Sequence, residues 1–279
     1  SSYTFYVKHA TKLVVSAEED FEYGSDVLIN FELDAIGQSP IFLVISTVDE
    51  ELYTVVVNNG NGTLTISDLP VGNYTVTSYF NGDNVNNYTE GNEVQFKVVK
   101  GTPEITADVK VDNALYPGSI IVTINGPDGD YTITVGNKTV PVTVTGGTAS
   151  EIISDLAVGT QTATVEFAGN ENCTNASITT ESFTIIPSSA EISASAADVW
   201  IGNDATVIVT VPSDAQGKVT ITVNGKKYEA EIAAGSATAT ISADDLVAGE
   251  NAIDVTFAGD DNYAAGFNST TVFVLDGVI

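Results

Sequence analysis

Apolar and polar residues alternate with a period of two along most of the chain, which is the pattern of half-buried β-strands. In the run Asp26–Leu33, every second residue from Val27 onwards is apolar. No stretch shows a sustained helical period. The sequence therefore predicts an all-β chain of short strands separated by Gly, Asn and Asp.

The predicted strands come in successive series of seven. The first series is Lys12–Ser16, Asp26–Leu33, Ile41–Thr47, Leu52–Val57, Gly62–Ser67, Tyr74–Phe80 and Val94–Val99. The second is Ile105–Val109, Ser119–Ile124, Tyr131–Val135, Val140–Val144, Ala149–Ile153, Thr160–Phe167 and Ile178–Ile186. Pro141 cannot donate to a ladder, so its strand is expected at a sheet edge. In the third series, Asn224-Gly225 between alternating runs predicts a type I′ hairpin.

One motif occurs three times and divides the chain. Its copies begin at Asp68-Leu69-Pro70-Val71-Gly72, Asp155-Leu156-Ala157-Val158-Gly159 and Asp245-Leu246-Val247-Ala248-Gly249, and each continues to a Phe-x-Gly-Asp/Asn segment. The last glycines of these copies recur after 87 and 90 residues, and intervals of this length hold whole small domains. We expect domains at 9–100, 101–187 and 188–279. Residues 1–8 are predicted to be the last strand of a preceding repeat or an extra N-terminal strand, because Phe5-Tyr6-Val7-Lys8 resembles the end of the first repeat.

Seven short strands in each repeat indicate three tandem immunoglobulin-like β-sandwich domains. Their linkers are short and contain proline, which predicts an elongated, semi-stiff array. Tyr74 lies two residues after Gly72, as in a tyrosine corner. With Gln161 and Ala252 taken as its counterparts, that corner is predicted to be absent from the other repeats. Trp200 is predicted to cover the end of its sandwich, with a sugar-stacking platform as the alternative.

Composition narrows the possible functions. The 279 residues carry a net charge of −28, and all nine basic residues are lysines. The 37 acidic residues are spread over the three repeats, so the charge is not a tail. Nucleic-acid binding and anionic membrane surfaces are therefore disfavoured. We interpret the charge as a source of solubility, with cation binding or a salty milieu as the alternative. Cys173, the only cysteine, is expected to be a small apolar replacement at the position of Tyr88 and Tyr263.

The sequence offers no catalytic constellation and no cofactor motif. His9 is the only histidine and has no nucleophile motif near it. Oxygen-rich loops follow the Phe-x-Gly segments, where Asp83, Asp260 and Asp261 are the candidate calcium ligands. Asp and Asn are also good turn formers, which is the competing interpretation. A calcium site would need further ligands from a second loop or a neighbouring domain.

The motif Asp-Leu-x-x-Gly-x-Tyr-Thr-Val, followed by Phe-x-Gly-Asp-x-Asn, resembles the Ig-like repeats of adhesin-like surface proteins from methanogenic archaea. The resemblance covers about 270 residues and also includes the hairpin Gly217–Tyr228. It implies a non-catalytic, extracellular fragment of a large cell-surface protein, acting as stalk and as cell- or surface-binding module. The implied partners are a surface protein or glycan of another cell and the neighbouring repeats.

Two other classes stay open. One is the accessory arm of a secreted enzyme that acts on cell walls or polysaccharides, and the other is a surface-layer structural subunit. A chain that only serves as a spacer predicts featureless flanks, whereas a binding module predicts an exposed apolar patch. Such a patch is expected near Phe42-Leu43-Val44 and Tyr53.

Overall fold

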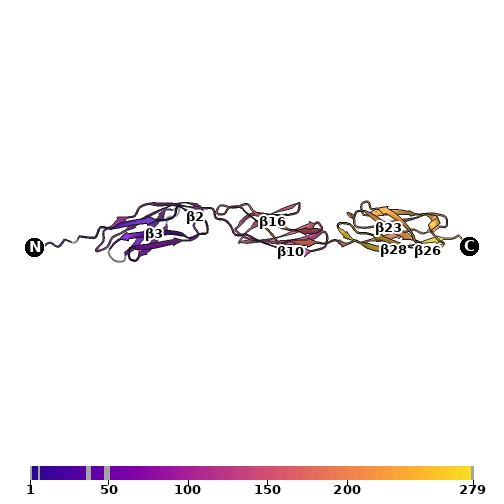
Figure 1. Cartoon of the computed structure of the whole chain (residues 1–279), viewed down its shortest axis with the longest axis horizontal. Helices are drawn as coiled ribbons and strands as arrows, with labels where there is room; N and C mark the ends of the chain where they lie inside the picture. Colours follow the sequence, from indigo (N-terminus) through magenta and orange to yellow (C-terminus); the bar gives the residue numbers. More distant parts are fainter. Residues whose placement is uncertain (1, 6, 36–38, 47–50, 278–279) are drawn as a thin grey trace.

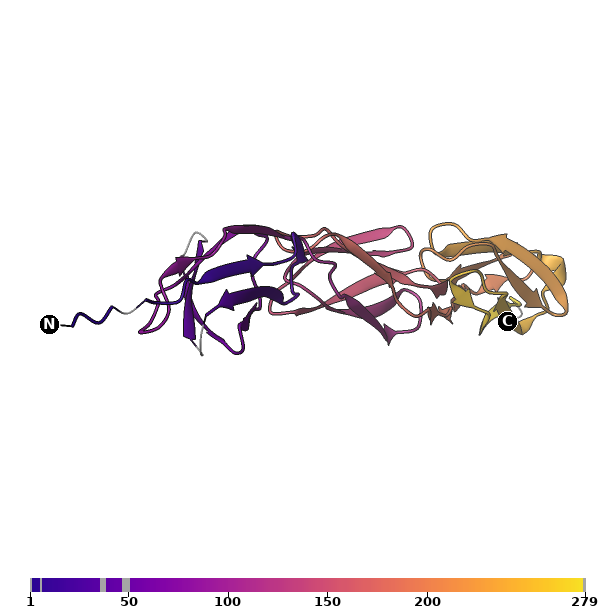
Figure 2. The ribbon, with the colours of Figure 1, turned by 60° about the vertical axis from the view of Figure 1, so that its left-hand side comes forward.

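The computed structural model describes residues 2–5, 7–35, 39–46 and 51–277. The described chain forms a long, narrow particle with the N- and C-termini towards opposite ends (Figure 1). Turning the molecule by 60° leaves it elongated (Figure 2). Almost every element is a β-strand, so the expectation of an all-β chain of immunoglobulin-like sandwiches is confirmed.

The N-terminal sandwich pairs a three-stranded sheet, in the order β1-β3-β6, with a larger sheet, in the order β2-β9-β7-β4-β5 with β8 beside β7. Its strands are β1 (Lys12–Ser16), β2 (Asp20–Glu22), β3 (Val27–Asp34), β4 (Ser39–Ser46), β5 (Glu51–Val57), β6 (Asn61–Ile66), β7 (Gly72–Phe80), β8 (Thr89–Glu90) and β9 (Val94–Val99). Residues 2–5, 7 and 8 form no strand, and the interpretation of residues 1–8 as a strand of another repeat stays a prediction.

The central sandwich contains a sheet β10-β11-β14, a sheet β13-β12-β16-β17 and the pair β15-β18. Its strands are β10 (Thr106–Asn113), β11 (Gly118–Asn125), β12 (Gly129–Val135), β13 (Lys138–Val144), β14 (Thr148–Leu156), β15 (Gly159–Gln161), β16 (Ala163–Phe167), β17 (Ala176–Thr179) and β18 (Phe183–Ile185). Pro141 lies in β13, which is an edge strand as predicted.

The C-terminal sandwich contains a sheet β20-β22-β25, a sheet β21-β28-β26-β23-β24 and the pair β19-β27. Its elements are β19 (Ser188–Ser189), β20 (Ser193–Ala196), β21 (Val199–Trp200), β22 (Ala205–Thr210), β23 (Lys218–Val223), β24 (Lys226–Glu231), β25 (Ser236–Ile241), the 3₁₀ turn η1 (Ala243–Asp245), β26 (Gly249–Phe257), β27 (Tyr263–Ala264) and β28 (Gly266–Leu275). Asn224 and Gly225 have φ of 47° and 80°, as the predicted type I′ hairpin requires. In the described ranges, no helix is long enough to cross a lipid bilayer.

The described buried side chains form three separate clusters, one for each sandwich. They extend from Leu13 to Val98, from Ile120 to Ile185 and from Ala205 to Val272. These core clusters result from the alternation of apolar and polar residues along the strands. Val207 and Val255, for example, point inward and are buried, while their neighbours along the strand face water. The predicted boundaries near residues 100 and 187 fall between the clusters and stay predictions.

Candidate functional site: the joints between sandwiches

Three equivalent loops are each organised by one short side chain with an oxygen acceptor. In the C-terminal sandwich, Asp260 Oδ1 accepts hydrogen bonds from the backbone N–H of Asn262 and Tyr263, both at 2.8 Å. Asp83 accepts from Val85 and Asn86 at 2.8 and 2.7 Å, and Asn170 accepts from Asn172 and Cys173 at 2.9 and 2.7 Å. An amide therefore makes the same turn as a carboxylate, and the turn itself needs no negative charge.

This geometry bears on the candidate calcium ligands. Asp83 and Asp260 are engaged as turn acceptors, and Asp260 Oδ2 also accepts the N–H of Gln216 at 2.7 Å. Asp261 follows in the same loop. Within the described ranges, no group of three or more His, Cys, Asp or Glu side chains is arranged to hold a metal ion. Calcium binding by Asp83, Asp260 and Asp261 stays a prediction.

Two substitutions of Asp260 distinguish the effect of the loop hydrogen bonds on stability from the effect of the negative charge. Asp260→Asn should keep the two loop bonds, which Asn170 makes in the central sandwich, and lose only the bond from the Gln216 N–H, so it should cost about 0.5–1 kcal/mol. Asp260→Ala should lower the stability of the C-terminal sandwich by about 1–2 kcal/mol, because two loop N–H groups lose their acceptor. Thermal unfolding of both variants checks this. Equal destabilisation by Asn and Ala would show that the carboxylate charge is required.

Each loop also holds the chain segment that enters its own sandwich. His9 N donates to Val85 O at 2.7 Å, Gly101 N to Asn172 O at 3.0 Å, and Ser188 N to Asn262 O at 3.1 Å. The segment and the loop are paired in parallel at each place, as in β19 with β27. This register aligns Cys173 with Asn86 and Tyr263. The expected alignment of Cys173 with Tyr88 is therefore wrong, whereas its alignment with Tyr263 is correct. Cys173 is buried, which agrees with a small apolar replacement.

The joint between the N-terminal and central sandwiches is tightly bonded. Asn172 Oδ1 accepts the N–H of Val71 at 3.4 Å, and Lys100 Nζ donates to Asn170 O. Tyr23 packs against both adjoining cores. A Cβ on Gly101 would lie 2.5 Å from the Tyr23 carbonyl oxygen, so this linker position requires glycine.

The joint between the central and C-terminal sandwiches is built around Asp214. Its carboxylate accepts the hydroxyl of Tyr263 at 2.7 Å and that of Tyr116, from the central sandwich, at 2.8 Å. The two tyrosine rings meet edge to face with centroids 5.6 Å apart. A groove of about 380 Å³ opens beside them, lined by residues that include Asn137, Gln161 and Asn262.

The Asp214 joint should be stable over a wide pH range. Hydrogen bonds from the hydroxyls of Tyr263 and Tyr116 lower the pKa of Asp214. The ionised carboxylate therefore stabilises the folded chain fully at pH values above the ordinary aspartate pKa of about 3.9, and this stabilisation is lost only as pH falls through the lowered pKa. Burial, followed by the bond to Asp214, raises the pKa of Tyr263 to about 12. The stabilisation by the protonated Tyr263 hydroxyl is therefore fully present at pH values below about 10 and is lost as pH rises through about 12.

An absorbance titration of tyrosinate checks this prediction. Tyr263→Phe should reduce the absorbance change near pH 12 by the share of one tyrosine, while other tyrosines with a raised pKa, such as Tyr74 and Tyr131, keep theirs. Tyr3→Phe, which changes an exposed tyrosine in the N-terminal segment, should leave the change near pH 12 at its wild-type size. An undiminished change near pH 12 in Tyr263→Phe would contradict the assignment.

The corner bond expected only for Tyr74 recurs in all three sandwiches. The Tyr74 hydroxyl donates to Pro70 O at 2.6 Å, as predicted. Gln161 Nε2 donates to Ala157 O at 2.8 Å, and Asn251 Nδ2 donates to Val247 O at 2.7 Å. The predicted loss of the corner is therefore wrong. The residue two positions after Gly249 is Asn251, not Ala252, and an amide reaches the same carbonyl four residues back.

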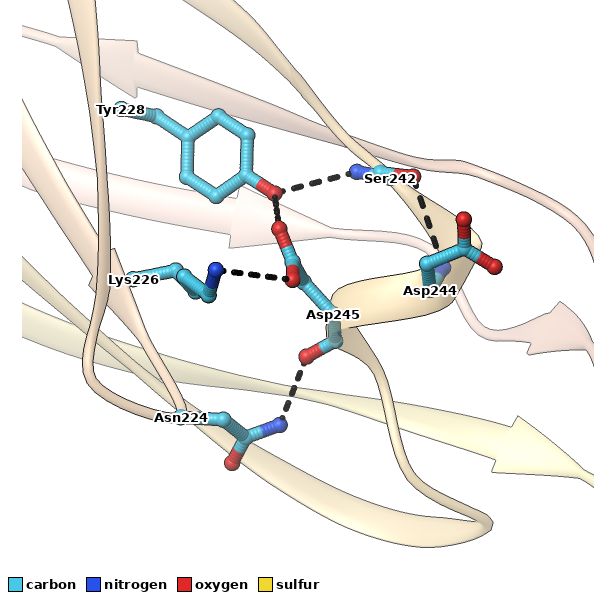
Figure 3. Close-up of polar contacts among 6 residues, drawn as sticks. All are labelled: Asn224, Lys226, Tyr228, Ser242, Asp244 and Asp245. Carbon is cyan, nitrogen blue, oxygen red and sulfur yellow. Dashed lines mark hydrogen bonds and ion pairs between the residues drawn. The ribbon is translucent and has the colours of Figure 1, made fainter.

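A polar cluster in the C-terminal sandwich fixes η1 to the hairpin (Figure 3). Asp245 Oδ2 accepts the Tyr228 hydroxyl at 2.5 Å, and its Oδ1 lies 3.8 Å from Lys226 Nζ. The bond to Asp245 raises the pKa of Tyr228. In the central sandwich, Lys138 and Asp155 make the corresponding ion pair at 3.7 Å. Lys226 and Lys138 each begin the second strand of a hairpin, and this shared position was the sequence signal for the two ion pairs.

Two other predictions concern exposed surface. Trp200 is 58% exposed, so the prediction that it covers the end of its sandwich is wrong. The side chains of Phe42, Leu43 and Val44 lie outside the described part of the molecule, and Tyr53 is partly buried against the N-terminal core.

The chain matches no family model. It also matches no curated protein. Among solved structures, it is similar to the fibronectin(III)-like modules of Clostridium thermocellum CbhA, with 17% identity, a TM-score of 0.26, and coverage of 60% of this chain and 94% of that one. It is also similar to the chicken CNTN1 FN1–FN3 domains, with 13% identity, a TM-score of 0.26, and coverage of 93% and 97%. A third is the ICAM-5 D1–D4 ectodomain fragment, with 11% identity, a TM-score of 0.33, and coverage of 94% and 77%.

Proposed function

We propose that this chain is a non-catalytic, extracellular segment of an archaeal adhesin-like surface protein, in which it serves as stalk and as surface-binding module. The observation that carries the stalk role is the pair of bonded joints. Asn172 in the loop of the central sandwich accepts the N–H of Val71 from the N-terminal sandwich, and Asp214 is bonded to tyrosines from both sides of its joint. Such contacts oppose bending and keep the sandwiches in line (Figure 1).

The repeated motif and the acidity support the extracellular part of the proposal. A net charge of −28 over 279 residues keeps an exposed rod soluble and limits contact between neighbouring rods. The partner in this role is a protein or glycan on another cell.

Small-angle scattering of the chain tests the stalk role. Three sandwiches, each about 35–40 Å long from strand rise plus loops, should give a rod on the order of 100–120 Å. The length should be the same in calcium and in chelator if the joints alone keep the rod straight. A compact particle in both buffers would contradict a stalk, and a rod only with calcium would place a cation at the joints.

Binding is tested separately with beads to which the chain is attached by one of its termini. Beads coated with the whole chain should attach to methanogen cells, whereas beads coated with the chain unfolded by heat should not. A rod that binds no cell surface would leave the stalk role intact and remove the binding role.

A further inference from the structure

We propose that the groove at the joint between the central and C-terminal sandwiches binds a neutral saccharide unit. The groove has a volume of about 380 Å³, and the residues that line it include Tyr116, Asn137, Gln161 and Asn262. Pockets for small ligands have volumes from about 300 Å³, and a few placed polar groups fix the orientation of what they bind. This inference rests on the surface-binding role proposed above and names the class of ligand for it.

Three amide side chains line this groove with hydrogen-bonding groups to spare. Within the described part of the chain, the side chains of Asn137 and Asn262 make no hydrogen bond. Gln161 Nε2 donates to Ala157 O at 2.8 Å, and Gln161 Oε1 has no partner among the same residues. An amide offers both donors and an acceptor, so it can bond to neighbouring hydroxyl groups of a sugar in either direction.

The equivalent corner of the C-terminal sandwich is closed by its own side chains. Asn224 begins the hairpin turn there, and its Nδ2 donates to Oδ1 of the corner residue Asn251 at 2.8 Å. In the central sandwich the turn asparagine is Asn137, one position later, and the corner residue is Gln161. Asn137 is exposed and does not bond to Gln161. The shift by one position therefore leaves the amides of this corner available to a ligand.

The counterpart of Asn262 at the other joint is already bonded across the joint. Asn172 and Asn262 hold the same loop position, because their carbonyl oxygens accept the N–H groups of Gly101 and Ser188. Asn172 Oδ1 also accepts the N–H of Val71 from the preceding sandwich at 3.4 Å. The Asn262 side chain makes no such bond to the described residues of the central sandwich, and it lines the groove instead.

Tyr116 supplies a fixed aromatic wall. Its hydroxyl is held by Asp214 at 2.8 Å, and its ring meets that of Tyr263 with centroids 5.6 Å apart. An aromatic ring presents a large apolar surface, against which the C–H groups of a pyranose ring can pack. Because both ends of the Tyr116 side chain are already held, little rotamer freedom is lost when a ligand binds.

Charge favours a neutral ligand. Lys138 and Asp155 are the two charged side chains that line the groove, and they pair with each other at 3.7 Å. The groove therefore carries no net charge of its own. The whole chain carries a net charge of −28, which repels acidic polysaccharides at longer range.

NMR titration of the isotope-labelled whole chain tests the site. The neutral probes are lactose, cellobiose, maltose and N,N′-diacetylchitobiose, and digalacturonate is the acidic probe. The chain is produced in a host that attaches no N-glycans, because Asn137-Lys138-Thr139 is an acceptor sequence for them. At least one neutral probe should shift the side-chain amide signals of Asn137, Gln161 and Asn262 at millimolar concentration, and digalacturonate should bind more weakly.

A double substitution, Asn137→Ala with Asn262→Ala, removes two of the three amides. It should weaken binding of the neutral probe by about tenfold or more, as expected for the loss of two hydrogen bonds. Asn175→Ala is the matched control and should leave binding unchanged, because Asn175 is an exposed asparagine in the loop at the other joint. The spectrum of each variant also shows whether it is folded.

Several outcomes would overturn the proposal. Binding of none of the neutral probes would do so, as would binding that the double substitution leaves at wild-type strength. Stronger binding of digalacturonate would overturn the neutral class of ligand. If coated beads attach to cells while the chain binds no saccharide, the groove is wrong and the surface-binding role stands. If the chain binds a saccharide while its beads attach to no cell, the groove stands and that role is removed.

Discussion

Replacing Phe257 with alanine is expected to lower the free energy of unfolding of the C-terminal sandwich by about 3–5 kcal/mol. Phe257 ends β26, is only 2% exposed and belongs to the core cluster between the two sheets. Truncation removes the ring's transfer free energy and leaves a cavity that the flanking strands cannot fill. The same phenylalanine recurs as Phe80 and Phe167 in the other sandwiches, also buried.

Native-state hydrogen exchange is the suitable measurement, because it resolves the sandwiches separately. Amides of β26 and β28 should lose protection, whereas those of β12 and β16 in the central sandwich should change little. Phe267→Ala is the matched control and should cost no more than about 0.5 kcal/mol, because the Phe267 ring lies on the surface. A loss below about 1 kcal/mol for Phe257→Ala would contradict its place at the centre of this core.

Asn251→Ala is expected to cost about 2–3 kcal/mol, the second largest effect. Asn251 is fully buried and its side chain is bonded on every side. Its Oδ1 accepts from Val247 N at 2.9 Å and from Asn224 Nδ2 at 2.8 Å, and its Nδ2 donates to Val247 O at 2.7 Å and Gly249 O at 3.1 Å. Alanine would leave several of these groups without a partner in a site closed to water.

Chemical denaturation followed by circular dichroism measures the effect. Gln161→Ala in the central sandwich is the control, since Gln161 makes only the single corner bond to Ala157 O on a more accessible surface. It should cost about 0.5–1 kcal/mol. Equal costs for the two substitutions would show that the corner bond, and not the wider Asn251 network, stabilises this turn.

Most of the longer strands could be predicted from the sequence because they follow local rules. Thr160–Phe167 and Ile178–Ile186, each predicted as one strand, are instead divided into β15 and β16 and into β17 and β18. Alternation located β1 at Lys12–Ser16 and β9 at Val94–Val99 with the correct bounds. The Asn224-Gly225 turn and the edge position of Pro141 follow from the φ preferences and the missing donor of these residues. Each conclusion needs only the residue and its immediate neighbours.

The joints could not be predicted in this way, because they depend on contacts between distant residues. The strand β2 exists because Asp20–Glu22 pairs in parallel with Lys97–Val99, more than seventy residues further on. In the sequence, Asp214 cannot be distinguished from other loop aspartates, because its partners Tyr116 and Tyr263 are brought to it only by the fold. The amide corners were missed for a different reason, since a motif built on tyrosine does not show which other donors reach the same carbonyl.

The pairing of β26 with β28 determines how the C-terminal sandwich responds when the rod is pulled at its two ends. Force applied through Leu275 runs along β28, which is registered with β26 over nine residue pairs. The hydrogen bonds of this ladder lie across the direction of pull and are loaded together in shear, so they must break as a group and not one after another. A tether built this way resists sudden tension better than one whose last strand could be peeled from its end.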